Sequence, residues 1–176
     1  MRRREFLVRT VTAAGTVWLS SKSILNAIAE QALPKKYAAS DTVTLGSTGI
    51  TTSRLAMGTG TVGVDHHSHQ TALGVKGLSD LLLNGYDHGL RFFDSADSYG
   101  SHPHVAEALK HVPRDKVTVL SKSWARDAAG MRADLDRFRK ELGTDYLDIC
   151  LMPCLTEADW TDRYRGAMDV LSEAKQ

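Results

Sequence analysis

From residue 42 onward, short apolar runs alternate with longer segments in which apolar residues recur every three or four positions. The short runs are typical of strands: VTLGSTGITT (43–52), SRLAMGTG (53–60), RFFDSA (91–96), KVTVLSKS (116–123) and YLDICLM (146–152). The periodic segments predict four helices, marked in turn by Leu73, Leu78, Leu81 and Leu82; by Val105, Ala108 and Leu109; by Met131, Leu135, Phe138 and Leu142; and by Trp160, Tyr164, Ala167 and Leu171.

The order of these elements is a β-hairpin followed by four strand–helix units. The first run contains the turn sequence GSTG (46–49) between two β-branched stretches, which predicts the hairpin. Strands that alternate with helices favour an α/β fold with a parallel sheet of βαβ units. The spacing of the strands fits either a doubly wound sheet or a barrel.

A glycine motif bears on that choice. Residues 58–63 read GTGTVG, which matches the Gly-x-Gly-x-x-Gly spacing of dinucleotide-binding doubly wound folds. However, the polar stretch VDHHSHQ (64–70) stands where the helix should begin, and no acidic residue ends a second strand at the expected distance. The motif is therefore a weak signal for a doubly wound fold, and both architectures stay open at this point.

Polar side chains stand at the carboxyl ends of two successive predicted strands, where a barrel keeps its chemistry. Asp94 ends the second strand, Lys122 ends the third, and Tyr99 lies in the loop after Asp94. A tyrosine hydroxyl ordinarily has a pKa of about 10, which a nearby ammonium lowers, and a carboxylate beside the lysine fixes that ammonium. Together these groups predict a general acid.

Four segments carry a resemblance to the aldo/keto reductase family. They are TLGSTGITTSRLAMGTGT (44–61), FFDSADSYG (92–100), VTVLSKS (117–123) and ELGTDYLDICLM (141–152). The second is similar to the family's Asp-x-Ala-x-x-Tyr-Gly motif and the third to its lysine strand. The likeness covers roughly residues 43–176 and implies a (β/α)8 TIM-barrel type fold, of which about the first four βα units are present.

The resemblance also implies roles for individual residues. Tyr99 would protonate the oxygen of a small carbonyl substrate while NADP(H) delivers hydride, with Lys122 tuning Tyr99 and Asp94 holding Lys122. Thr59, Gly60 and Asp94 would lie against the cofactor. The family's catalytic histidine after the fourth strand aligns with Pro153, whose side chain can neither donate nor accept a hydrogen bond.

A second departure is length, because a (β/α)8 barrel takes about 250 residues. We expect most of the dinucleotide site to lie in the missing half, and a homodimer or a second half-barrel chain to complete the barrel. The alternative is a non-catalytic half-barrel interaction module or a truncated gene fragment. A metal-dependent hydrolase on the histidine-rich rim is a third hypothesis. The histidines of this rim are His66, His67 and His69 in the first loop and His102 and His104 after Tyr99, and we expect them to form a solvated polar loop without metal.

The N-terminus predicts export. RREFL (3–7), a short apolar stretch and the small-x-small site AIA (27–29) resemble a twin-arginine signal peptide. The alternative is an amphipathic or disordered basic N-terminus. We therefore assign residues 1–29 to a signal, 30–41 to a linker and 42–176 to the partial reductase domain. The protein would be periplasmic, without a stable membrane anchor after cleavage.

Composition narrows the class of protein further. The chain has 22 basic and 21 acidic residues among 176, a balance that lacks the excess positive charge of a nucleic-acid binder. Its two cysteines, Cys150 and Cys154, are too far apart along one strand for a disulfide, so we expect two buried thiols.

Overall fold

The computed structural model describes residues 36–175. The predicted signal peptide, residues 1–29, lies outside the described residues, as do residues 30–35 of the predicted linker. Within 36–175, none of the helices combines the length and the apolar character that a membrane span requires.

The predicted hairpin is confirmed. Strands β1 (Thr42–Thr44) and β2 (Thr51–Ser53) pair antiparallel, with Val43 opposite Thr52. The hairpin is fastened to the beginning of the next sheet, because the Thr52 hydroxyl donates to the carbonyl of Arg91 and the Arg91 amide donates to the Ser53 hydroxyl. It therefore lies at the amino ends of the sheet strands, away from the predicted site.

Four parallel strands form the sheet in the order β3-β4-β5-β6, as the strand–helix alternation predicts. They are β3 (Met57–Gly58), β4 (Phe92–Asp94), β5 (Thr118–Lys122) and β6 (Ile149–Leu151). Each paired segment is shorter than its apolar run. Within the described residues the sheet does not close into a barrel, and β3 and β6 are its two edges.

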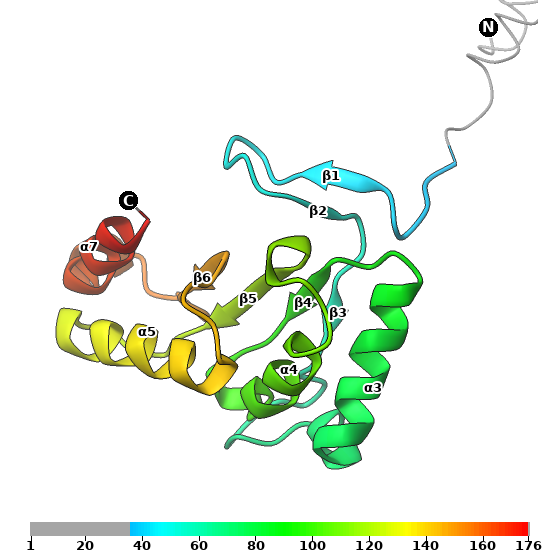
Figure 1. The fold of residues 1–176 in the computed structure, drawn as a ribbon. Helices are drawn as coiled ribbons and strands as arrows, with labels where there is room; N and C mark the ends of the chain where they lie inside the picture. The colour runs from blue at the N-terminus through cyan, green and yellow to red at the C-terminus, as the bar shows by residue number, and fades with distance from the viewer. Residues whose placement is uncertain (1–35, 176) are drawn as a thin grey trace, which may run out of the picture. The chain divides into compact units, whose positions relative to one another are not determined.

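Helices follow the strands in sequence. They are α3 (Gly74–Asp87), α4 (His102–Leu109), α5 (Ala128–Leu142), α6 (Trp160–Arg163) and α7 (Arg165–Ala174). Neighbours α3, α4, α5 and α7 pack side by side in that order along the sheet (Figure 1). Three short 3₁₀ turns lie in the connections between strands and helices: η1 (Thr71–Leu73), η2 (Asp97–Tyr99) and η3 (Arg114–Lys116). The predicted fourth helix is real but interrupted at Tyr164.

The helix–sheet core uses alternate residues of the strands. Phe93 of β4 and Val119 of β5 are fully buried in the cluster that α3, α4 and α5 cover. Their neighbours Phe92 and Leu120 line a groove on the other face of the sheet. Strands with apolar residues on both faces are typical of parallel sheets that are covered on both sides.

Helix α5 owes its limits to its end residues. The Asp127 carboxylate accepts a hydrogen bond of 2.8 Å from the amide of Gly130, which makes Asp127 the N-cap. Gly143 ends the helix with φ of 63°, a conformation that glycine adopts without steric cost. The predicted stop at Gly143 is therefore confirmed, and the helix begins close to the polar loop after β5.

The prediction for the cysteines holds only in part. Both thiols are free, as expected. Cys150 on β6 is partly buried, and burial raises the pKa of its thiol to about 11. Cys154 is exposed, so the prediction of a buried thiol there is wrong. The physical reason is that β6 ends at Leu151, so Cys154 lies in the loop beyond the sheet, with φ of 54°.

Candidate active site

Asp94 and Lys122 meet at the carboxyl edge of the sheet. Parallel pairing of β4 with β5 places Asp94 opposite Leu120, two residues before Lys122. The Lys122 ammonium donates to the Asp94 carboxylate, and it also donates to the carbonyl of Ser95 at 3.0 Å. The Lys122 side chain is 16% exposed, so its charge is held by the protein rather than by bulk water.

Tyr99 completes this group. It ends η2, directly after β4, and Gly100 with φ of 63° follows it. The Lys122 nitrogen lies 4.9 Å from the centroid of the Tyr99 ring. Within residues 36–175, the Tyr99 hydroxyl makes no hydrogen bond, which leaves it free to donate to a bound molecule. The structure thus brings all three predicted catalytic residues together.

The glycine motif packs against Tyr99. A Cβ at Gly60 or at Gly63 would come within 2.2 Å of the Tyr99 ring, so neither position has room for a side chain. The segment follows β3 directly and runs into a loop rather than a helix. The absence of side chains at Gly60 and Gly63 therefore makes room for the ring of Tyr99.

Thr59 is buried beneath the same loop. Its hydroxyl is 2.9 Å from the carbonyl of Asp94 and 2.8 Å from the Ser101 hydroxyl, and its amide also donates to the carbonyl of Asp94. Thr59 and Gly60 therefore lie beside Asp94 and Tyr99, at the place the prediction gave them. Their contact with a cofactor stays a prediction.

The five histidines predicted to lie on the rim divide into two groups. His66, His67 and His69 are exposed in the loop after β3, as expected. His102 and His104 are buried at the beginning of α4, so the prediction of a solvated loop is wrong for this pair. They were misassigned because the helix begins at His102, which turns both rings toward the core instead of the rim.

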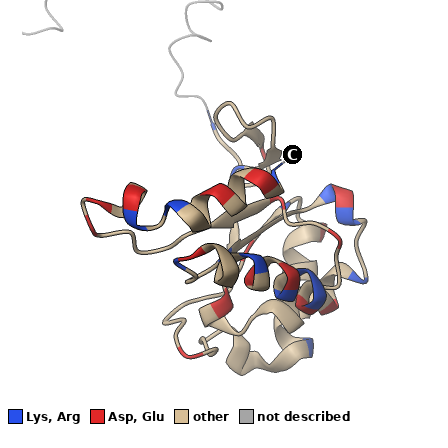
Figure 2. Cartoon of the chain, turned by 90° about the vertical axis from the view of Figure 1, so that its left-hand side faces the viewer, with Lys and Arg blue, Asp and Glu red and all other residues tan. Residues whose placement is uncertain are grey.

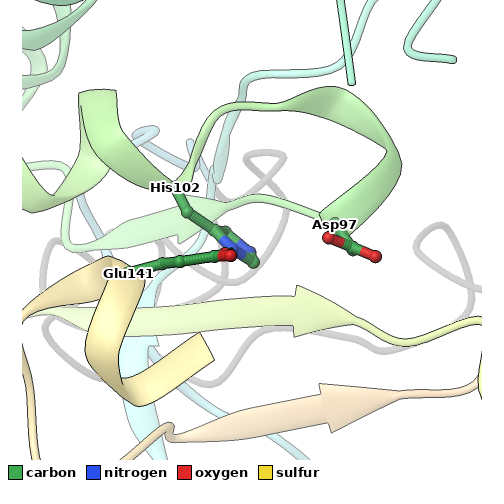
Figure 3. Close-up of side chains that lie close together, drawn as sticks. All are labelled: Asp97, His102 and Glu141. Atoms are coloured by element: carbon green, nitrogen blue, oxygen red, sulfur yellow. The ribbon is translucent and has the colours of Figure 1, made fainter. Parts of the chain in front are cut away.

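His102 is hydrogen-bonded on both ring nitrogens. Nδ1 lies 2.6 Å from the Glu141 carboxylate and Nε2 lies 2.8 Å from the Ser121 hydroxyl, as Figure 3 shows for Glu141. Burial lowers the pKa of His102 below 6.5 and outweighs the opposing pull of Glu141. We therefore assign the neutral ring with its proton on Nδ1. In this tautomer Nδ1 donates to the Glu141 carboxylate and Nε2 accepts from the Ser121 hydroxyl.

Arg137 of α5 joins this pair to the Tyr99 turn. Its guanidinium contacts Asp97 at 2.7 and 2.9 Å, Asp134 at 2.8 Å and Glu141 at 3.0 Å. The pKa of Arg137 is raised above its usual value, and the hydrogen bonds to Asp97 are the largest cause. Burial opposes ionisation of Asp97, yet Arg137 holds the pKa of that carboxyl below 3.8.

This polar network was absent from the sequence-based prediction. Arg137 and Glu141 share one face of α5 at the i,i+4 spacing, but nothing local indicates that Asp97 and His102 face them. Ligand atoms of Asp97, His102 and Glu141 lie within 4.8 Å of one another. The guanidinium of Arg137 already forms ion pairs with the carboxylates of both Asp97 and Glu141. These two carboxylates are therefore better explained as partners of Arg137 than as ligands of a metal ion.

Pro153 lies where the resemblance expects a histidine. It follows β6, and its carbonyl accepts a hydrogen bond of 2.7 Å from Arg126. That guanidinium also lies over the rings of Trp124 and Tyr164, at 5.4 and 5.2 Å from their centroids. The fourth strand end thus presents a backbone carbonyl and an arginine rather than an imidazole.

Charges of both signs are interleaved on the helices. Figure 2 shows blue and red segments alternating along them, and several are close pairs such as Arg132 with Glu173. The strand-end site is therefore distinguished by its chemistry and burial, not by a surrounding field of one sign.

Comparison with known proteins decides the family. Residues 54–176 match the Aldo/keto reductase family. The chain belongs to the aldo/keto reductase family. Among curated relatives, an NADPH-dependent D-xylose reductase of Meyerozyma guilliermondii is 34% identical over 82 residues, which are 42% of this chain and 26% of that one. A 7-acetyl-epi-neemfruitin B aldo-keto reductase of Melia azedarach is 31% identical over 127 residues, 63% of this chain and 37% of that one.

Solved aldo/keto reductases share the fold. One from Brucella melitensis has a TM-score of 0.60 at 23% identity, over 81% of this chain and 50% of that one. One from Klebsiella pneumoniae, solved with NADPH, has a TM-score of 0.56 at 26% identity, over 77% of this chain and 46% of that one. The chain thus spans about half of these solved reductases, and 26% and 37% of the two curated relatives.

Proposed function

We propose that this member of the aldo/keto reductases contributes the proton donor for NADP(H)-dependent reduction of a carbonyl compound. The observation that carries the proposal is the placement of the Lys122 ammonium, paired with Asp94, 4.9 Å from the centroid of the Tyr99 ring. Relatives named as NADPH-dependent reductases support the choice of cofactor.

The residues fit the reacting end of such a cofactor and its substrate. The Tyr99 hydroxyl is an unengaged donor within the described residues, beside the fixed charge of Lys122. Thr59 and Gly60 are proposed to flank the nicotinamide, with Asp94 beside them. When bound, NADPH supplies a hydride to the carbonyl carbon.

The chain's own residues handle the proton. As negative charge develops on the carbonyl oxygen, Tyr99 transfers its hydroxyl proton to that oxygen, and the alcohol forms. The phenolate left on Tyr99 is stabilised by the Lys122 ammonium, which Asp94 and the Ser95 carbonyl hold in place. Water then restores the proton to Tyr99.

Replacing the acid tests this role. Tyr99→Phe removes only the hydroxyl, so we expect oxidation of NADPH by an aldehyde to fall by about 100-fold or more. The measurement is the loss of NADPH absorbance. Tyr86→Phe is the matched control, because Tyr86 lies near the end of α3, beside Arg91, away from the strand ends that carry Asp94 and Lys122. Equal turnover in Tyr99→Phe and wild type would remove Tyr99 from the mechanism.

We also propose that further parallel strands complete the site. The free edges β3 and β6, and the groove lined by Leu120, Ile149 and Leu171, suit addition of a second half, from another copy or another chain. Sedimentation of the native protein should show an assembly larger than one chain of this length. A single 176-residue chain that turns over substrate would contradict this part.

Export is a separate proposal. The RREFL and AIA segments support translocation by the twin-arginine route and cleavage after Ala29, which would make the protein periplasmic. Sequencing the N-terminus of the native protein should give Glu30 as its first residue. An uncleaved Met1 in the cytoplasmic fraction would overturn the proposal.

A further inference from the structure

The short turn η2 carries both Asp97 and Tyr99. One side of this turn rests on the loop after β3. There the amide of His66 donates to the carbonyl of Ser98 at 3.0 Å, and the Tyr99 ring lies against Gly60 and Gly63. The His66 ring adds a second contact, because its Nδ1 lies 3.0 Å from the carbonyl of Asp97 and 3.8 Å from the Asp97 carboxylate, but the His66 side chain is 67% exposed to water.

The other side of the turn is held by one charged side chain of α5. Both terminal nitrogens of Arg137 donate hydrogen bonds to the Asp97 carboxylate, at 2.7 and 2.9 Å. Two parallel hydrogen bonds of this kind fix the orientation of both partners as well as the distance between them. The Asp97 side chain is only 16% exposed, so water competes weakly for it.

Arg137 is itself anchored to the sheet. Asp134, which accepts from Arg137 at 2.8 Å, also accepts from the Ser123 hydroxyl next to Lys122. Glu141 accepts from Arg137 at 3.0 Å and from His102, whose ring reaches Ser121 on β5. The network therefore links the turn bearing Tyr99 to the strand bearing Lys122.

We propose that Arg137 is a positioning residue for Tyr99. By fixing Asp97 two residues before Tyr99, it sets the position of the phenol relative to the Lys122 ammonium on the neighbouring strand. Figure 3 shows Asp97 on this turn, apart from the His102–Glu141 pair, and Arg137 spans that gap through its contacts with Asp97 and Glu141. The catalytic meaning of this role rests on the proposed function, whereas the positioning itself does not.

The test observes Tyr99 directly, without turnover. Protein carrying ¹³C-labelled tyrosine rings gives a separate NMR signal for Tyr99, which Tyr99→Phe identifies by its disappearance. In Arg137→Gln we expect this signal to move toward the position of a free tyrosine and to sharpen. In Arg139→Gln, the matched control, it should stay in place, because Arg139 forms an exposed pair with Asp136 on the same helix.

A second variant covers the case in which Arg137→Gln does not fold. Asp97→Asn preserves the shape of the side chain and one acceptor but removes the charge, so we expect a smaller shift of the Tyr99 signal in the same direction. A Tyr99 signal unchanged in a folded Arg137→Gln or Asp97→Asn protein would overturn the proposal. So would an equal shift in Arg139→Gln.

Kinetics separate positioning from function. If both proposals hold, Arg137→Gln lowers kcat by between about ten- and a hundredfold, as misplacement of a catalytic group does, while KM for NADPH is unchanged. Arg137→Lys keeps the positive charge, but its single nitrogen cannot make both hydrogen bonds to Asp97, so this variant should recover part of that loss. If the Tyr99 signal shifts but the native protein never oxidises NADPH, the positioning stands and the proposed reaction falls.

Discussion

Gly63 shows at the scale of one residue how closely the site is packed. A Cβ there would lie 2.2 Å from a carbon of the Tyr99 ring and 2.9 Å from the carbonyl oxygen of Gly60. Gly63→Ala must displace one of these groups, and overpacking of this kind costs about 1–3 kcal/mol. We expect a lower free energy of unfolding in urea and a loss of turnover.

Gly58→Ala provides the comparison for that prediction. A Cβ at Gly58 meets nothing within 4 Å, although the residue ends β3 only two positions before Gly60. Gly58→Ala should therefore unfold like the wild type. Equal destabilisation of the two variants would mean that the Tyr99 ring is not packed on the loop as the structure shows.

Pro153 is the residue at which the resemblance expects a histidine. Pro153→His would place an imidazole donor after β6, where the resemblance expects one to orient the carbonyl, and we predict a gain in kcat of about tenfold. Cys154→His adds the same group one residue later and serves as the control. A gain that is equal in the two variants, or absent in Pro153→His, would contradict this role.

At the scale of elements, the hydrogen bonds of His102 with Glu141 and Ser121 join α4 to α5 and β5. Their contribution to the free energy of unfolding should depend on pH. The folded protein keeps His102 neutral because burial lowers its pKa, while the unfolded chain takes up a proton at about 6.5. This contribution to the free energy of unfolding is complete above about pH 6.5 and declines as the pH falls toward the lower folded value. Glu141, Asp97 and Arg137 are the charged groups around the ring, and Asp97 and Arg137 keep their charges over this range.

Urea unfolding at about pH 7 and pH 5 measures this effect. Wild type should lose more stability between the two than His102→Gln, since glutamine can donate to Glu141 and accept from Ser121 without titrating. A wild-type loss no larger than that of His102→Gln would show that His102 is charged in the folded protein.

Elements were predictable where the pattern is local. Short apolar runs identified the hairpin and four strands, and the helical period identified four helices. Polar residues at the strand ends, with a tyrosine in the loop beyond, pointed to Asp94, Lys122 and Tyr99. The contact of Arg137 with Asp97 was not predictable, because it joins residues 40 positions apart. The break at Tyr164 and the exposure of Cys154 also depend on where elements stop, which periodicity leaves open.

At the scale of the whole molecule, one sheet carries Asp94 and Lys122, and within residues 36–175 its edge strands β3 and β6 each pair on one side only. Phe93 and Val119 face the helices, while Phe92 and Leu120 line the groove on the opposite face. Asp94 and Lys122, with Tyr99 beside them, lie at the carboxyl ends of β4 and β5, and the β1–β2 hairpin is hydrogen-bonded at the opposite end of the sheet. Asp94, Tyr99 and Lys122 therefore meet within this sheet, whereas the proposed completion of the site depends on further strands.

Deuterium transfer tests the central claim most directly. The native protein, in the assembly in which it is isolated, is incubated with NADPH deuterated at the reactive carbon of the nicotinamide and with a panel of aldehydes and ketones. Mass spectrometry of the alcohols then reads out the reaction. The account predicts one deuterium on the former carbonyl carbon with wild type and a near-complete loss of that product with Tyr99→Phe. A folded wild-type protein that binds NADPH but gives no deuterated alcohol, or a Tyr99→Phe protein that gives as much as wild type, would contradict it.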